Sequence, residues 1–160
     1  MAVIPGKIVS FLEQRANVAM CGTRDQDLVP HAHRVTGWRV GPERDSMECF
    51  VPEPFTEDLV ESLEDNARIA VTIEEFPSHE TYQFKGHYLA RRPAAADDLA
   101  IHEQCRERFV RSVRTVLNLP DDVLRAFILK PHIVVSFKVD EIYLQTPGPG
   151  AGSRMVPRQD

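Results

Sequence analysis

The chain has 160 residues, a formal net charge of −5, 42% hydrophobic residues and 27% charged residues. This length suits one domain with a substantial core, and the composition is typical of a globular protein. Because no basic face dominates, the composition argues against nucleic acid as a partner. No apolar run approaches 18 residues and no secretory signal is visible, so we expect no membrane partner and a cytoplasmic location.

The first third of the chain predicts one helix and two strands. Ile8, Phe11 and Leu12 fall on one side of residues 4–15, which indicates a short amphipathic helix. A strand at 18–23 and a polar turn at 24–27 follow. The next strand, 28–40, is longer and is interrupted by Pro30 and Gly37, which favours an edge or a bend.

Residues 47–74 predict a strand, a short helix and a second strand with little loop between them. Side chains alternate at 47–52 and again at 69–73, the period of extended segments. Between them, Thr56 is the expected N-cap of a helix that ends near Asn66. Glu57 and Asp58 fall in its first turn, where the helix dipole favours negative charge. We expect any ligand site to be anchored on this unit.

The remaining elements are a strand, two helices and a last strand. A turn at 76–80 precedes a strand at 81–90, and residues 93–96 are expected to break it. A long helix is expected over 97–117, because Ile101, Cys105, Phe109 and Val113 recur every four residues. A short helix at 121–129 and a strand at 133–139, continued at 142–144, complete the domain.

The predicted fold is mainly β with flanking helices. Six strands with turn-type links favour antiparallel pairing, and closing the sheet would remove its edges. We therefore predict a six-stranded antiparallel barrel as a single domain over residues 1–146. Residues 147–160 form a Pro- and Gly-rich tail, expected to lie along a surface or to be disordered.

Few residues carry an obvious chemical signal. His31 and His33 lie two apart on a strand and project to one face, but no nearby Cys or carboxylate completes a metal set, so hydrogen-bonded or exposed histidines are favoured. The three cysteines have unrelated spacings, which favours reduced thiols, and Cys21 is expected to be a buried small hydrophobe. Arg34 is an anion-binding candidate, with a rim salt bridge as the alternative. The arginines at 106, 108, 111 and 114 are expected to form a solvated helix face.

The order of elements carries a family resemblance over residues 4–90. The segments that carry it are VAMCGTRDQDLVPHAHRVTGWRV, MECFVPEPFTEDLVESLEDNARIAVTI and YQFKGHYL. Together they resemble the pyridoxamine 5′-phosphate oxidase-like, FMN-binding split-barrel superfamily, and the ending FKVDEIYLQTPGPGAG resembles a flavoprotein subgroup. The resemblance implies a split β-barrel homodimer that holds FMN in clefts between its subunits. It also implies an oxidoreductase acting on a small-molecule substrate, which the sequence does not identify.

The same resemblance implies the positions of the cofactor site. It places one group of residues beside the flavin phosphate and ring, namely Arg34, Val35 and Thr36. It places a second group at the end of the next strand, namely Val51, Pro52 and Glu53. Backbone N–H groups near Thr56, at the start of the helix, are a further candidate for binding an anion. No side chain is assigned as a catalytic acid or base.

The family's basic phosphate clamp falls on Asp58 and Leu59 in this chain. A carboxylate there repels a phosphate, and Thr81 replaces the family's glutamine, so pyridoxamine 5′-phosphate oxidase activity is not expected. Arg154, or arginines of a dimer mate from 106–114, are alternative phosphate ligands. Two other possibilities stay open: a non-catalytic or stress-related binding protein, and a binder of haem or deazaflavin, with His31, His33 and His87 as haem candidates.

Overall fold

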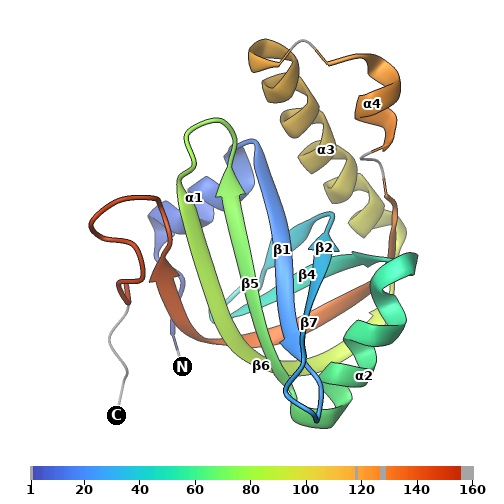
Figure 1. The fold of residues 1–160 in the computed structure, drawn as a ribbon, viewed down its shortest axis with the longest axis vertical. Helices are drawn as coiled ribbons and strands as arrows, with labels where there is room; N and C mark the ends of the chain where they lie inside the picture. Colours follow the sequence, from blue (N-terminus) through green and yellow to red (C-terminus); the bar gives the residue numbers. More distant parts are fainter. Residues whose placement is uncertain (1, 118, 127–128, 156–160) are drawn as a thin grey trace.

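The computed structural model describes residues 2–117, 119–126 and 129–155 (Figure 1). The helices are α1 (Gly6–Gln14), α2 (Thr56–Asn66), α3 (Ala96–Val116) and α4 (Asp121–Ala126), and a 3-10 turn, η1 (Glu53–Phe55), precedes α2. The strands are β1 (Asn17–Arg24), β2 (Pro30–Val35), β3 (Trp38–Val40), β4 (Ser46–Pro52), β5 (Arg68–Glu75), β6 (Thr81–Pro93) and β7 (Pro131–Leu144). None of the helices within these described residues has the length and hydrophobicity that crossing a bilayer requires.

The strands form one curled antiparallel sheet in the order β2-β1-β5-β6-β7-β4-β3. The Thr36 N–H donates to the Phe50 carbonyl at 2.9 Å, and the Phe50 N–H donates to the Gly37 carbonyl at 2.9 Å. These bonds join the two ends of the sheet, because the segment that contains Thr36 and Gly37 connects β2 with β3. The predicted strand at 28–40 is thus divided at its expected break, and the six predicted strands appear as seven.

The barrel interior is filled by aromatic and branched side chains. Phe84 and Phe137 have no exposed surface, and Ile8 and Leu12 of α1 join the same core. Phe50 is also fully buried, but it lies near Gly37 and is not part of this core. The alternation of buried and partly exposed positions along β1 and β5 confirms the two-residue period of the sequence. One face of each of these strands therefore lies outside the barrel, where a ligand or another chain can reach it.

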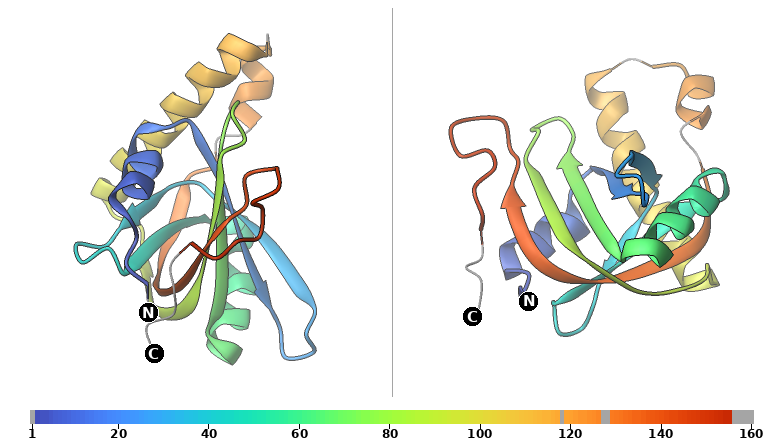
Figure 2. Two further views of the ribbon diagram at one scale, coloured as in Figure 1. Left: turned by 90° about the vertical axis from the view of Figure 1, so that its left-hand side faces the viewer. Right: turned by 60° about the horizontal axis from the view of Figure 1, so that its bottom comes forward.

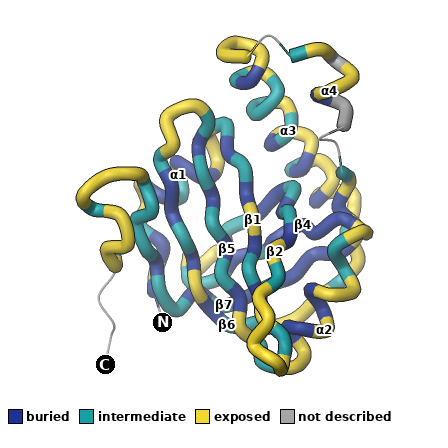
Figure 3. The backbone as a smooth tube through the Cα atoms, viewed as in Figure 1, coloured by how far each residue is buried: buried dark blue, intermediate teal, exposed yellow. Residues whose placement is uncertain are grey.

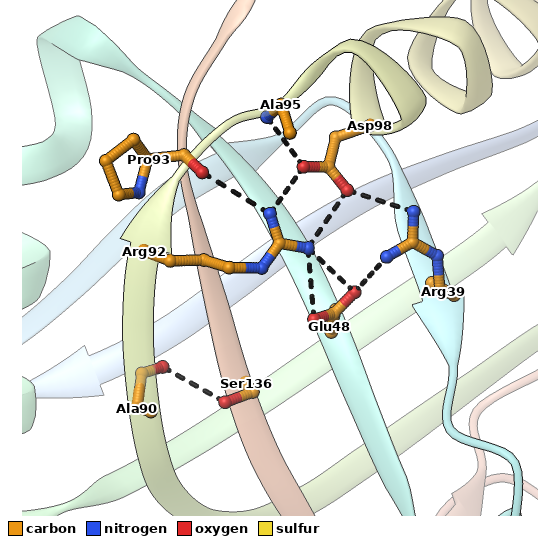
Figure 4. A network of polar contacts seen from close by, with 8 residues as sticks. All are labelled: Arg39, Glu48, Ala90, Arg92, Pro93, Ala95, Asp98 and Ser136. Atoms are coloured by element: carbon orange, nitrogen blue, oxygen red, sulfur yellow. Dashed lines mark hydrogen bonds and ion pairs between the residues drawn. The ribbon is translucent and has the colours of Figure 1, made fainter.

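A network of four charged side chains fastens α3 to the barrel (Figure 4). Asp98, in the first turn of α3, is 1% exposed and accepts hydrogen bonds from Arg39 at 3.0 Å and Arg92 at 2.5 Å. Glu48 accepts from the same two arginines, at 2.5 Å from Arg39 and 3.2 Å from Arg92. The hydrogen bond from Arg92 holds the pKa of Asp98 at about 2. α3 and α4 lie at one end of the barrel, as Figure 2 shows from two further sides.

Two predicted features of the unit 47–74 and its neighbours need correction. The N-cap of α2 is Phe55, and Thr56 is the first helical residue. The reason is that η1 precedes the helix directly, so the Thr56 hydroxyl donates to the Pro52 carbonyl at 3.2 Å and caps no helix N–H. Likewise β6 continues past its expected end at residue 90 to Pro93, the first residue of the expected break, because its last residues pair with β7 up to Ile133.

The C-terminal segment folds back on β7 over residues 145–155. The Leu144 N–H donates to Ser153 at 2.9 Å, and the Met155 N–H donates to Ile142 at 2.8 Å. Tyr143 and Arg154 form an antiparallel bridge within this hairpin. The segment thus lies along the surface, one of the two expected arrangements. Residues 156–160 of the tail, and 127–128 of the expected helix at 121–129, lie outside the described residues.

Candidate functional site

The outer face of the sheet brings polar side chains from distant parts of the chain into rows. Figure 1 looks onto β1, β5 and β6 with no helix in front of them, and Figure 3 shows many partly exposed positions there. In one row, Gly22 pairs with Ala70, Ala70 with Lys85, and Lys85 with Glu141. Gly22 and Ala70 have no long side chains, so they leave a depression in this face of the sheet.

A pocket of about 620 Å³ occupies this low region. We call it the basic pocket, and it is lined by Gly22, Thr23, Arg24, Arg68, Ile69, Ala70, Lys85, Gly86, Asp140, Glu141 and Arg154. Four cationic and two anionic side chains in this lining leave a net charge of +2. The volume lies within the roughly 300–1,000 Å³ of ordinary small-molecule sites.

One end of the basic pocket holds two arginines. The pairing of β1 with β5 ends at Gly22 and Ala70, and Arg24 and Arg68 are the next outward residues of the two strands, so both line this end of the pocket. Like charges on neighbouring strands repel. An anion placed between them would remove this repulsion and gain two charge-assisted hydrogen bonds.

The other end of the basic pocket is neutralised by a carboxylate. Glu141 stands opposite Lys85 and forms an ion pair with Arg154 at 3.1 Å. The Tyr143 hydroxyl donates to the second carboxylate oxygen of Glu141 at 2.7 Å, and this bond raises the pKa of Tyr143. The other lining carboxylate, Asp140, lies 3.0 Å from a ring nitrogen of His87.

The residues implied by the family resemblance lie elsewhere on the barrel. Arg34, Val35 and Thr36 line a cavity of only about 50 Å³ beneath α3. His102 of α3 closes this cavity and donates from Nδ1 to the Thr36 carbonyl at 2.8 Å. Burial lowers the pKa of Arg34. The bond between Thr36 and Phe50 puts this group beside β4, which carries the second group.

That second group lies at the end of β4 and the start of η1, and Thr56 follows as the first residue of α2. Val51 and Pro52 are buried, Glu53 is exposed, and Thr56 is half-buried. None of the seven implied residues lines the basic pocket, whereas Arg154, the alternative phosphate ligand, does. The assignment of the seven to a cofactor stays a prediction.

The start of α2 borders an acidic pocket instead of a phosphate clamp. This acidic pocket, of about 420 Å³, is lined by Asp25, Gln26, Asp27, His31, Asp58, Glu61, Ser62 and Asp65. Within it, a ring nitrogen of His31 lies 3.2 Å from the Asp25 carboxylate. Five carboxylates around one hollow repel a phosphate dianion. The chemistry of this position therefore does not fit the phosphate of FMN.

The histidines do not gather into one site. The rings of His31 and His33 stack at 6.2 Å, which confirms that they share a face, and His33 is 4% exposed. His87 lies on β6 beside Asp140. In the described part of the chain, no three His, Cys, Asp or Glu side chains are placed to hold a metal ion.

The three cysteines are free and buried. Burial raises the pKa of Cys21 to about 12, and it also raises the pKa of Cys49 and Cys105. Such thiols stay protonated at neutral pH and are poor nucleophiles. This agrees with the interpretation of Cys21 as a small hydrophobe of the core.

Four residues of the basic pocket were not predicted from the sequence, namely Arg24, Arg68, Lys85 and Glu141. Their signal was present, because each occupies an outward position of a strand in the alternating pattern. Alternation assigns a side chain to a face, but only the pairing register shows which outward residues become neighbours.

The chain is similar to several solved structures. No protein-family model and no curated protein matches the chain. HupZ of Group A Streptococcus is similar in structure, with a TM-score of 0.56 and 15% identity over 94% of this chain and 100% of that one. A proposed pyridoxamine 5′-phosphate oxidase from Lactobacillus delbrueckii has a TM-score of 0.53 and 11% identity, over 88% of this chain and 93% of that one. An F420 reductase has a TM-score of 0.52 and 9% identity, over 83% of this chain and 94% of that one.

These similarities confirm the resemblance at the level of the fold. The chain has the split-barrel fold of pyridoxamine 5′-phosphate oxidase-like proteins. Identities of 9–15% assign no ligand, so the chemistry has to be argued from the side chains of this chain.

Proposed function

We propose that the chain is a flavoprotein that binds FMN in the basic pocket and serves as an oxidoreductase for a small molecule. The observation that carries this proposal is that the basic pocket combines small residues at its base with two arginines at one end. Gly22 and Ala70 leave room for a flat ring system, and Arg24 and Arg68 at one end of the pocket supply two guanidinium groups for a phosphate dianion. When bound, the flavin supplies the redox chemistry, and the protein binds and orients it.

The basic pocket also supports a homodimer. The pocket lies on a sheet face with no helix in front of it in Figure 1, so a flavin there would have one side open to water. A second copy of the chain packed on this face would cover the ring and exclude water from it. We therefore propose that two copies close the pocket between them, as the resemblance implies.

Gly22→Trp tests the position of the ring. A Cβ at Gly22 would meet only the Ala70 and His31 carbonyl oxygens, both at 3.9 Å, so the larger side chain enters the pocket without disturbing the sheet. We expect FMN affinity, measured by quenching of flavin fluorescence, to fall more than about tenfold. Met20→Trp, on the same face of β1 but outside the pocket lining, is the control and should retain FMN.

Arg68→Ala tests the position of the phosphate. We expect it to weaken FMN about tenfold and to leave riboflavin, which has no phosphate, unchanged. Arg111→Ala on α3 is the matched control. Asp58→Lys should change FMN affinity less than about twofold, because the proposed phosphate position is not at α2. A large gain from Asp58→Lys, or a loss of FMN in Arg34→Ala alone, would move the cofactor to the site implied by the resemblance.

Visible absorbance separates the flavin from the other open possibilities. Purified protein incubated with excess FMN and then desalted should retain the flavin spectrum. A protein that stays colourless contradicts the proposed function and leaves a non-catalytic binding role. A haem or deazaflavin spectrum in the protein as purified would replace FMN by that ligand.

A further inference from the structure

The two ends of the basic pocket differ in the charge that they offer a ligand. Arg24 and Arg68 belong to adjacent strands, and their row lies one step away from the row of Ala70, Lys85 and Glu141. Arg68 pairs with His87, which lies two residues along β6 from Lys85, so Arg68 and Lys85 are diagonal neighbours on adjacent strands, about 7–8 Å apart. A ligand with two neighbouring anionic groups could therefore contact both Arg68 and Lys85.

Glu141 occupies the place that a second anionic group would need. It is paired across the strands with Lys85, and it holds the guanidinium of Arg154 at 3.1 Å. The Tyr143 hydroxyl fixes its other oxygen at 2.7 Å, while the ammonium of Lys85 stands 4.6 Å from the centre of the Tyr143 ring. The carboxylate is thus already the anionic partner of Arg154, and it stands opposite Lys85 on the neighbouring strand.

Residues 145–155 fold back on β7 as a hairpin, which we call the tail hairpin, and this hairpin keeps Arg154 in its position. Tyr143 and Arg154 are bridge partners, and the bonds from Leu144 to Ser153 and from Met155 to Ile142 fix the backbone on both sides. Arg154 therefore stays beside Glu141 without a ligand. A second phosphate could bind Arg154 only by displacing a carboxylate that is held by a hydrogen bond and an ion pair.

We infer that Glu141 is a specificity-determining residue that restricts the basic pocket to ligands with a single phosphate group. It leaves the Arg24–Arg68 end open to one dianion and repels a second anionic group at the Lys85–Arg154 end. The inference rests on the proposed function for its biological ligand, a flavin monophosphate. The charge selectivity itself follows from the pocket and needs no flavin.

Glu141→Gln tests this selectivity with inorganic phosphate and inorganic pyrophosphate as probes. The amide keeps the size of the side chain and an acceptor for the Tyr143 hydroxyl, but it removes the charge. By isothermal titration calorimetry we expect pyrophosphate to bind about tenfold more tightly than to the unchanged protein. Affinity for phosphate, which uses the arginine end, should change less than about twofold.

Two further variants distinguish a local charge effect from a general one. Asp140→Asn removes the other lining carboxylate, which already contacts His87, and should affect both probes equally. In the double variant Glu141→Gln/Arg154→Gln, the gain for pyrophosphate should disappear, because the released cation is absent. Thermal unfolding of each variant verifies that the tail hairpin and the barrel remain folded.

The outcomes separate this inference from the proposed function. Equal gains for both probes in Glu141→Gln, or no gain for pyrophosphate, overturn the role of Glu141. A selective gain for pyrophosphate in a protein that binds no FMN supports the role of Glu141 and contradicts the flavin. FMN binding without a selective gain supports the flavin and rejects the specificity residue.

Discussion

Asp98 is a nearly fully buried carboxylate whose energetics are set by two arginines. Its pKa is lowered from 3.8 to about 2, chiefly by the hydrogen bond from Arg92. A lowered folded-state pKa contributes stability above the unfolded pKa, and this contribution disappears as the pH falls through the folded value. The contribution at pH 7 is about 2 kcal/mol.

We predict that Asp98→Asn lowers the free energy of unfolding by at least about 2 kcal/mol at pH 7. The difference from the unchanged protein should shrink between pH 4 and pH 2, where Asp98 becomes protonated. Urea unfolding at several pH values measures both effects. Asp97→Asn, its exposed neighbour in the same helical turn, should cost less than about 0.5 kcal/mol, and an equal pH dependence in the two variants would contradict the assignment.

Gly86 and Gly22 are two strand glycines with opposite tolerance. A Cβ at Gly86 would lie 1.8 Å from the Lys138 carbonyl oxygen, at a bulge between β6 and β7. We predict that Gly86→Ala costs about 3 kcal/mol, because backbone must move to admit the methyl group. Gly22→Ala should stay within about 0.5 kcal/mol. Chemical denaturation of both variants checks this, and equal stability would disprove the close approach.

At the scale of elements, the sequence predicted α2 well except for its first turn. Leu59 and Leu63 are buried as the apolar stripe requires, and the helix ends at Asn66 as expected. The first turn differed because η1 precedes the helix without a gap. A short 3-10 turn has no distinctive period, so the sequence pattern cannot separate it from a loop.

The end of α2 offers a stabilising change. Ala67 adopts the left-handed conformation with φ 55° and ψ 17°, which a residue with a Cβ adopts at a cost. We predict that Ala67→Gly raises the free energy of unfolding by about 0.5–1 kcal/mol. Ala90→Gly in extended β6 should lower it instead. Thermal unfolding of both variants would reject the explanation if they shifted in the same direction.

At the scale of the molecule, the barrel was predictable and the basic pocket was not. Alternation along β1 and β5, together with the break at Gly37, predicts an antiparallel closed sheet, because these signals are local. The pocket combines residues from β1, β5, β6, β7 and the tail hairpin. Its cations become neighbours only through strand register, which a single sequence does not specify.

The position of the family's phosphate clamp is acidic in this chain. The sequence showed that Asp58 stands where the family has a cation, and the fold adds Asp25 and Asp27 of the β1–β2 hairpin to the same hollow. Two segments distant in sequence thus reinforce one negative field. The cations gather instead in the basic pocket, where we propose that the phosphate binds.

The most direct measurement of the central claim is a comparison of FMN with riboflavin. The two ligands share the ring and differ in the phosphate, so the difference in their affinities reports the arginine end of the basic pocket alone. We predict that FMN binds at least about tenfold more tightly than riboflavin, and that an Arg24→Ala/Arg68→Ala variant abolishes this difference. Equal affinity for the two ligands, or a preference for FMN that survives in the double variant, would contradict the account.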